Sequence, residues 1–161
     1  NAGQRYRKPL EDISAIELEE IFRVNVITPF ILAQSCLAGM KSRKSGKIIN
    51  ISSILGKSGL SFLSGYSATK GAIDSMTRAL SVELAPHSIQ VNAIAPGFCK
   101  TSYFDKFQKN EDLYSTITEK IPLGRWGNPD ELNGLLDFLL FGQSEYMTGQ
   151  VLYLDGGWTA Q

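Results

Sequence analysis

Tyr66 and Lys70 are the side chains whose types and spacing best suit acid–base chemistry. They lie four positions apart, so on a helix they project from the same face. A phenol has a pKa of ~10 and transfers protons poorly at neutral pH, but a neighbouring ammonium favours the phenolate and lowers that pKa. The pair therefore predicts an acid–base tyrosine that is tuned by a lysine. The structural alternative is a buried tyrosine beside a lysine that reaches to solvent.

A strand, a loop and a helix are expected to position this pair. The strand, Lys47–Ser52, has the near-continuous apolar core that is typical of a parallel strand covered on both faces. The glycine- and serine-rich stretch Ser53–Gly65 predicts a loop, and a helix is expected over Tyr66–Leu84. This order brings a serine, a tyrosine and a lysine to one cleft.

The remaining elements alternate in the same way. A long helix is expected over Ala15–Met40, with a capping box formed by Ser14 and Glu17, and its many apolar positions predict burial on much of its circumference. Because helices separate the strands, the chain predicts right-handed crossovers and a parallel sheet with helices on both faces. Further elements expected are strands at 89–95 and 150–154, a helix at 130–141 capped by Asn128, and one or two short helices in a flap at 98–121.

Composition indicates a soluble globular domain with a small-molecule partner. The 161 residues are 43% hydrophobic with net charge zero, and the interspersed charges form no patch for nucleic acid or an anionic membrane. Cys36 and Cys99 have neither disulfide nor metal spacing, so we expect free thiols, no metal site and a cytoplasmic location. No apolar run is expected to span a bilayer, which takes about 18–20 residues.

Six motifs in one order resemble the short-chain dehydrogenase/reductase family over the whole chain. They are Asn1-Ala2-Gly3, Asn25 in Arg-Val-Asn-Val, Ile-Ile-Asn-Ile-Ser-Ser, Tyr-Ser-Ala-Thr-Lys, Pro96-Gly97 and the ending Thr-Gly-Gln-Val-Leu-Tyr-Leu-Asp-Gly-Gly. A lone Tyr-x-x-x-Lys is common by chance, whereas six ordered motifs are specific. Ser53 precedes Tyr66 by thirteen residues, as the family's catalytic serine does, which favours Ser53 over Ser52.

The resemblance implies hydride transfer between NAD or NADP and a carbonyl or secondary alcohol. By carry-over, Tyr66 exchanges the hydroxyl proton, Ser53 hydrogen-bonds the substrate oxygen, and Lys70 tunes Tyr66 and holds the nicotinamide ribose. The main-chain carbonyl of Asn25 holds a water that links Lys70 to solvent. The cofactor contacts implied are Asn1, Ala2, Gly3, Tyr66, Lys70, Pro96, Gly97 and Thr101.

Two of these roles have structural alternatives. Ser53 could simply cap a loop, and Asn25 could be a buried, hydrogen-bonded amide. Pro29 gives the Asn25 relay independent support, because a proline four residues later cannot donate the N–H that normally occupies the carbonyl of Asn25.

One departure from the family concerns its glycine-rich cofactor turn, Thr-Gly-x-x-x-Gly-x-Gly, which is absent from this sequence. That turn lets a helix N-terminus approach the pyrophosphate. Residues 1–161 are therefore expected to be the C-terminal, catalytic and substrate portion of a single Rossmann-like, doubly wound α/β domain, with three strands and four to five helices. Alone, the stretch is expected to be inactive or to need a partner chain.

Alternatives to an oxidoreductase are a non-enzymatic binding or scaffolding module that has lost cofactor binding, and an extended-type epimerase or dehydratase. The compact ending at Asp155-Gly156-Gly157 argues against the latter. Within the family, the chain is similar both to members that act on gluconate and related sugar acids and to 3-oxoacyl-carrier-protein reductases. The resemblance also implies a homo-oligomer, a dimer or homotetramer, built on the two long helices and on the last helix and strand.

Overall fold

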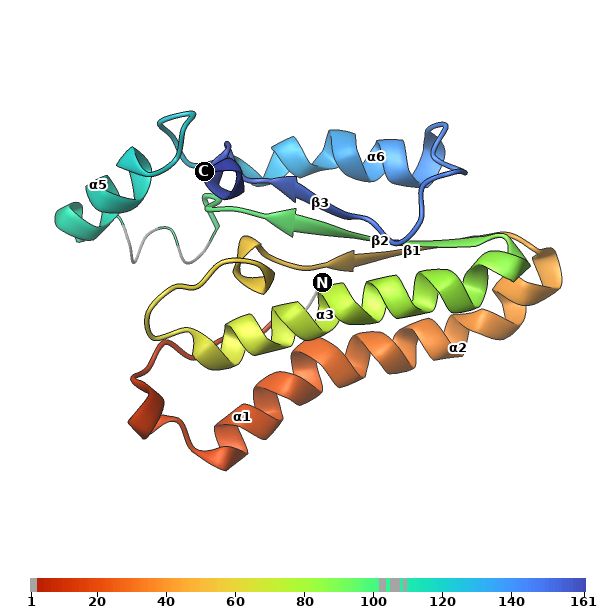
Figure 1. Cartoon of the computed structure of the whole chain (residues 1–161), viewed down its shortest axis with the longest axis horizontal. Helices are drawn as coiled ribbons and strands as arrows, with labels where there is room; N and C mark the ends of the chain where they lie inside the picture. The colour runs from red at the N-terminus through yellow and green to blue at the C-terminus, as the bar shows by residue number, and fades with distance from the viewer. Residues whose placement is uncertain (1–2, 102–103, 105–107, 109) are drawn as a thin grey trace.

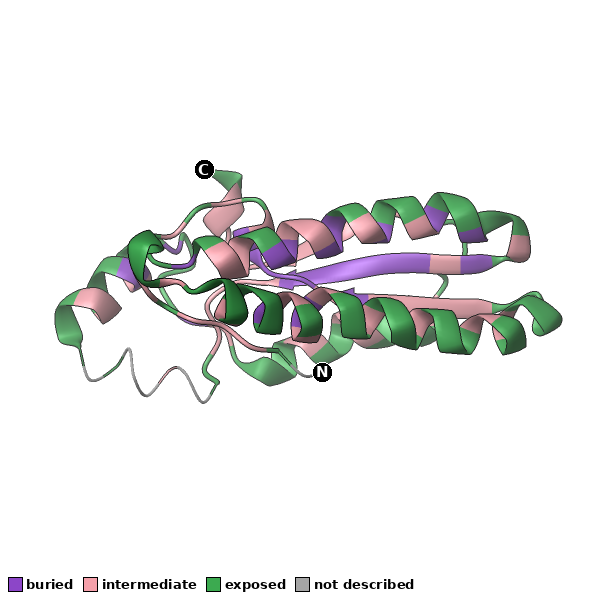
Figure 2. Cartoon of the chain, turned by 90° about the horizontal axis from the view of Figure 1, so that it is seen from below, coloured by how far each residue is buried: buried purple, intermediate pink, exposed green. Residues whose placement is uncertain are grey.

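The fold is built on a parallel sheet whose strands are β1 (Gly46–Ile51), β2 (Ile89–Pro96) and β3 (Val151–Leu154), in that spatial order. The computed structural model describes residues 3–101, 104, 108 and 110–161 (Figure 1). Gly46 pairs with Ile89, and Ala93 pairs with Val151. The central strand β2 is buried along most of its length (Figure 2). The predicted parallel sheet is therefore confirmed.

Helices cover both faces of the sheet, as predicted. On one side lie α1 (Ala15–Phe22), α2 (Thr28–Arg43) and α3 (Ser64–Leu84), and on the other lies α6 (Asn133–Phe141) (Figure 1). The helix α3 packs on β2 through a buried face that includes Ile73, Thr77 and Leu84. It begins two residues before the predicted start, which places Tyr66 in its first turn. Ser14 and Glu17 form the expected capping box at α1.

The predicted long helix is interrupted by a π-helical segment, η2 (Arg23–Ile27), between α1 and α2. There the N–H of Thr28 donates to the carbonyl of Arg23, five residues back, and the Thr28 hydroxyl donates to the same carbonyl at 2.9 Å. A π-helical turn inserts one extra residue and shifts the hydrogen-bond pattern, and such turns are frequent at functional sites. The helix then continues to Arg43, three residues beyond the predicted end.

The prediction that this helix is buried on much of its circumference is wrong. Over Ala15–Arg43 only Ile21 and Asn25 are buried, and Phe30, Ile31 and Leu32 are 46–61% exposed. In the described chain this helix packs mainly on α3 and β1, and the N-terminal segment contacts it through Asn25, Glu17 and Glu20, so its other faces stay exposed.

The stretch Ala15–Arg43 also contradicts the expectation that no apolar run could span a bilayer. Its 29 residues are long and apolar enough to cross a membrane by length and composition. Core helices of soluble proteins and signal sequences meet the same test; here α1 and η2 pack against α3, while only 17% of the apolar window is buried. Length and composition therefore do not assign this helix to a membrane.

The rest of the chain encloses the carboxyl ends of the strands. The predicted flap at 98–121 contains α5 (Glu111–Glu119), while its residues 102–103, 105–107 and 109 lie outside the described residues. Phe98 and Trp158 pack against two small cores, one around Trp126 and one around Leu63. Short 3₁₀ turns complete the chain at Leu10–Asp12 (η1), Ile54–Gly56 (η3), Ala85–His87 (η4), Pro129–Leu132 (η5) and Trp158–Ala160 (η6).

Candidate active site

Two cavities meet at the carboxyl ends of β1 and β2, the edge at which open α/β sheets bind their ligands. The larger is a groove of about 860 Å³ along β1 and α2, and the smaller is a cavity of about 330 Å³ between the loop after β1 and the segment after β2. Seven residues line both and form their shared wall: Arg5, Ile51, Ser53, Tyr66, Pro96, Gly97 and Thr101. Five of the seven are predicted site residues.

Lys70 stands one helical turn after Tyr66, and its ammonium lies 5.6 Å from the centre of the Tyr66 ring. The side chain is only 7% exposed, and its Nζ donates to the carbonyl of Ile51 at 2.7 Å. Burial lowers the pKa of Lys70 to about 8, against the opposing effect of the Asp74 carboxylate. At neutral pH a cation therefore sits beside the tyrosine, as the spacing predicts.

Ser53 and Ser52 face in different directions. The Ser52 hydroxyl is buried and donates to the carboxylate of Asp74, whereas Ser53 lines both cavities. The Ser53 oxygen accepts the N–H of Leu55 at 3.2 Å, so Ser53 also caps the η3 turn, as its structural alternative states. This contact occupies only an acceptor position of the hydroxyl, which leaves its proton able to reach a substrate oxygen.

Asn25 joins the N-terminal segment to α3. Its amide nitrogen donates to the carbonyl of Gln4 at 2.8 Å and to the hydroxyl of Thr69 at 3.1 Å, and its amide oxygen accepts the N–H of Gln4 at 2.9 Å. The side chain is therefore the buried, hydrogen-bonded amide of the structural alternative. A proton relay through Asn25 would have to use its main-chain carbonyl, and that role stays a prediction.

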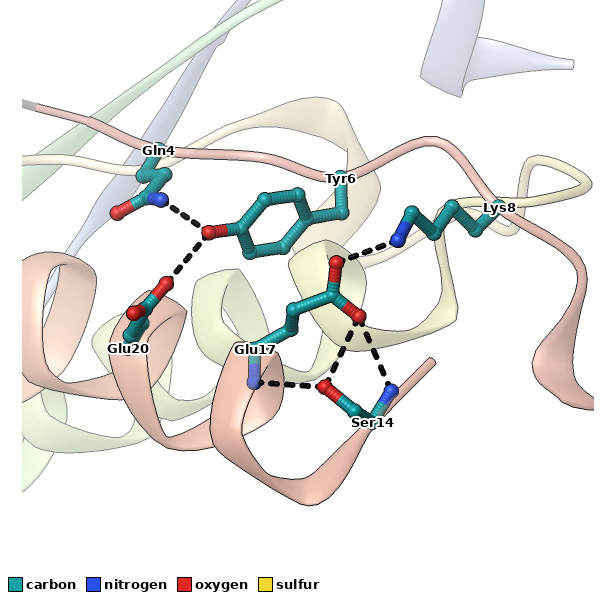
Figure 3. A network of polar contacts seen from close by, with 6 residues as sticks. All are labelled: Gln4, Tyr6, Lys8, Ser14, Glu17 and Glu20. Atoms are coloured by element: carbon teal, nitrogen blue, oxygen red, sulfur yellow. Dashed lines mark hydrogen bonds and ion pairs between the residues drawn. The ribbon is translucent and has the colours of Figure 1, made fainter. Parts of the chain in front are cut away.

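A network of polar contacts holds the N-terminal segment against α1 (Figure 3). The amide of Gln4 donates to the Tyr6 hydroxyl, which donates to Glu20 at 2.7 Å. Lys8 pairs with Glu17, the residue that also completes the capping box with Ser14 (Figure 3). These contacts fix the backbone on both sides of Arg5, which lies in the wall shared by the two cavities.

Asp74 is a buried carboxylate at the site that sequence reasoning missed. It lies four residues after Lys70, is 5% exposed, and accepts the hydroxyl proton of Ser52. Burial raises the pKa of Asp74, against the lowering effect of its hydrogen bond with Ser52 and of nearby Arg78 and Lys70. The repeated four-residue spacing was the available signal. Asp74 ties α3 to the strand end that carries Ser53.

The predicted cofactor contacts separate into three groups. Gly3 and Lys70 line the groove alone, Tyr66, Pro96, Gly97 and Thr101 line the shared wall, and Asn1 and Ala2 lie outside the described residues. Gly97 has a packing reason as well, because a Cβ there would lie 2.7 Å from the Cα of Asp155.

Lys70 is a residue of this groove that could hold the nicotinamide ribose of NAD or NADP. The Lys70 ammonium lies in its wall with one of three donors given to Ile51, so the other donors are available for ribose hydroxyls. Within the described residues, no group of three or more His, Cys, Asp or Glu side chains could hold a metal ion.

Known proteins are similar to this chain in both sequence and fold. A family model described as enoyl-(acyl carrier protein) reductase, of the short-chain alcohol dehydrogenase type, matches residues 1–159. The chain is 38% identical over 157 residues to the 5-keto-D-gluconate 5-reductase of Escherichia coli K12, covering 98% of this chain and 62% of that protein. It is 38% identical over 159 residues to a tropinone reductase homolog of Arabidopsis thaliana, covering 99% of this chain and 60% of that protein.

Among solved structures, a putative NAD(P)-dependent gluconate 5-dehydrogenase from Beutenbergia cavernae with bound NADP is similar over the whole chain. Its TM-score is 0.96 and its sequence identity 36%, and the match covers 100% of this chain and 65% of that one. The chain thus spans less than two thirds of the length of these proteins, and it matches their C-terminal fold elements with the same topology.

Proposed function

Because this chain belongs to the short-chain dehydrogenase/reductase family, we propose that the protein is an NAD(P)-dependent oxidoreductase acting on the CH–OH group of its donors. One observation carries the proposal: Tyr66 and Ser53 lie in the wall between a groove that fits the cofactor and a cavity that fits a small substrate. Lys70 adds a buried ammonium beside Tyr66. The acid–base side chains therefore lie at the wall where a cofactor in the groove and a substrate in the smaller cavity would exchange a hydride.

In the reducing direction, the side chains handle the substrate oxygen and its proton. Ser53 donates a hydrogen bond to the carbonyl oxygen, and Tyr66 transfers its phenol proton to that oxygen as the C=O π bond breaks. When bound in the groove, NAD(P)H would supply the hydride that reduces the carbonyl carbon to an alcohol, at the cost of its own oxidation. Lys70 stabilises the resulting phenolate and holds the ribose hydroxyls, and Tyr66 regains its proton from solvent.

Titration of the full-length polypeptide with NADH and NADPH tests this function against the non-enzymatic alternative. We expect one of the two to bind with a dissociation constant of roughly 1 μM to 1 mM and to be oxidised when 5-keto-D-gluconate or a simple ketone is added. Fluorescence of the reduced nicotinamide reports both steps. If neither cofactor binds, a binding or scaffolding module that has lost the cofactor becomes the better explanation.

The relay assigned to Asn25 leads to a separate expectation for Pro29→Ala. Alanine adds a backbone N–H that proline lacks just after η2, and this donor would compete with a water held by the main-chain carbonyl of Asn25. We expect a slower proton-transfer step in single-turnover experiments, with cofactor affinity nearly unchanged. Ser35→Ala, an exposed change on the same helix, serves as the control. Equal single-turnover rates for Pro29→Ala and the wild type would remove Asn25 from the mechanism.

The proposed function also includes an oligomeric state and a cellular location. We infer a cytoplasmic homo-oligomer, a dimer or homotetramer, whose contacts use α1, α2 and α3 on one side and α6 and β3 on the other. Exposed apolar side chains on both sets of elements support this inference, namely Ile16, Ile27, Phe30, Ile31 and Val82, and Phe138, Leu140 and Phe141.

A further inference from the structure

Resting on the proposed function, we propose that Ser52 and Asp74 are positioning residues for the reaction: Asp74 on α3 holds the Ser52 hydroxyl, and this hydrogen bond turns the next residue, Ser53, toward the substrate. Both side chains are buried, Ser52 at 3% exposure and Asp74 at 5%. Neither of them lines the smaller cavity, in which the substrate is expected to bind, so the pair acts through Ser53.

Ser52 and Ser53 face opposite sides because the backbone is extended at the end of β1. Successive side chains of an extended chain point to opposite faces, and Ser53 has φ −164° and ψ 156°. Ile51 and Ser53 accordingly line the smaller cavity. Asn50 and Ser52 do not line it and instead form hydrogen bonds to α3. Fixing Ser52 on α3 therefore fixes the direction of Ser53.

Hydrophobicity alone does not determine which face of β1 packs on α3. Isoleucine side chains lie on both faces of this strand, so a shift of one residue would exchange the faces at little hydrophobic cost. The amide of Asn50 donates to the hydroxyl of Thr77 at 2.8 Å. Ser52 donates to Asp74, three residues earlier on α3. These polar groups are buried, and a shifted strand would leave them without partners, so the two hydrogen bonds specify the arrangement in which Ser53 faces the cavity.

The turn after Ser53 packs on the same carboxylate. Gly56 belongs to η3, and its N–H donates to the carbonyl of Ser53 at 2.9 Å. A Cβ at Gly56 would lie 2.5 Å from the Oδ2 atom of Asp74, so a larger residue would displace the carboxylate. Asp74 therefore contacts the chain on both sides of Ser53, through the hydrogen bond with Ser52 and through close packing at Gly56.

The variant Ser52→Ala tests the link, because it removes the hydroxyl and leaves the carboxylate of Asp74 in place. In the full-length protein we expect kcat to fall by about tenfold and the KM for NAD(P)H to change by less than about twofold, as a misplaced reacting group would cause. In a Ser53→Ala background the same change should lower kcat by less than about twofold, because no hydroxyl is left to position. Equal losses in the two backgrounds would overturn the proposal. Ser81→Ala is the matched control, since Ser81 is a buried, hydrogen-bonded serine of α3 that lines neither cavity.

Two substitutions of Asp74 separate its hydrogen bond from its charge. The amide oxygen of asparagine still accepts the Ser52 hydroxyl, so Asp74→Asn should keep kcat within about threefold of the wild type, whereas Asp74→Ala should lower it by about tenfold. The assay is run at about pH 6, well below the pKa of about 8 of Lys70, which limits the effect of the lost charge on that ammonium. A loss in Asp74→Asn as large as that in Asp74→Ala would mean that Asp74 acts through its charge, and the positioning role would be wrong.

Hydrogen exchange at the Leu55 amide reports the direction of Ser53 without catalysis. The N–H of Leu55 donates to the Ser53 hydroxyl oxygen at 3.2 Å, so a Ser53 side chain that turns away leaves this N–H unprotected. Ser52→Ala and Asp74→Ala should each speed exchange at Leu55 by about tenfold or more, with the amide of Ala93 within the sheet as the internal reference. Unchanged exchange in both variants would overturn the proposal even if the enzyme is active. A wild type that reduces no ketone with either cofactor would instead contradict the proposed function, and the exchange rates would still test the positioning of Ser53.

Discussion

Tyr66→Phe is expected to lower kcat by about 10²–10⁴-fold, the usual contribution of a positioned acid–base group. Phenylalanine keeps the ring in the first turn of α3 but cannot transfer a proton. The Ser53 hydroxyl and the Lys70 ammonium stay in place, so cofactor affinity should change little. Steady-state kinetics with the best ketone, together with NADPH and NADH titrations, measure both quantities.

Tyr146→Phe supplies the matched control. Tyr146 is fully exposed and lines neither cavity, so its hydroxyl has no part in the proposed chemistry. Near wild-type turnover by Tyr66→Phe, with cofactor affinity retained, would contradict the assignment of Tyr66. Thermal unfolding of the two variants distinguishes a lost proton donor from a lost fold.

Local rules explain why the chemistry of this site was visible in the sequence. Tyr66 and Lys70 meet because helix geometry places residues four apart on one face, whatever surrounds them. The strand Gly46–Ile51 and the helix Ser64–Leu84 lie within two residues of their predicted limits, since apolar periodicity and a following proline mark them. The approach of Ser53 then follows from the parallel strand that precedes it.

Contacts between segments that are distant in the chain could not be predicted from the sequence. Ser52 and Asp74 are 22 residues apart, and Asn25 and Gln4 are 21 residues apart. No local sequence pattern therefore predicts either hydrogen bond. Pro29 predicted an irregular helix. Because both a kink and a π-helical turn can accommodate a proline that lacks its N–H, the sequence did not show which of the two would form. The apolar face of Ala15–Arg43 shows which surface can be buried and not which element covers it.

Lys70→Met is expected to lower kcat by at least about 10²-fold while raising the free energy of unfolding of the cofactor-free protein. Burial moves the pKa of Lys70 from its ordinary value of 10.5 to about 8, so the folded protein holds a charge that it disfavours. That shift corresponds to about 3 kcal/mol at neutral pH, and the lost hydrogen bond to Ile51 offsets about 1 kcal/mol. The free energy of unfolding of Lys70→Met should therefore exceed that of the wild type by roughly 1–3 kcal/mol.

The gain should depend on pH in a defined direction. Below about pH 8, Lys70 is protonated in both the folded and the unfolded chain, and the full penalty of burial applies. Between about pH 8 and 10.5 the folded chain releases the proton while the unfolded chain keeps it, so the stability of the wild type rises with pH. The methionine variant lacks this rise, and its advantage should shrink over the same interval.

Urea unfolding of the wild type and Lys70→Met at about pH 7 and about pH 10 measures this difference. Lys41→Met, at an exposed position in the last turn of α2, should change stability by less than about 0.5 kcal/mol at either pH. A constant loss of stability in Lys70→Met at both pH values would mean that packing and the Ile51 hydrogen bond outweigh the buried charge. The expected pattern would instead identify Lys70 as a residue whose placement sacrifices stability for catalysis, which a purely structural lysine would not do.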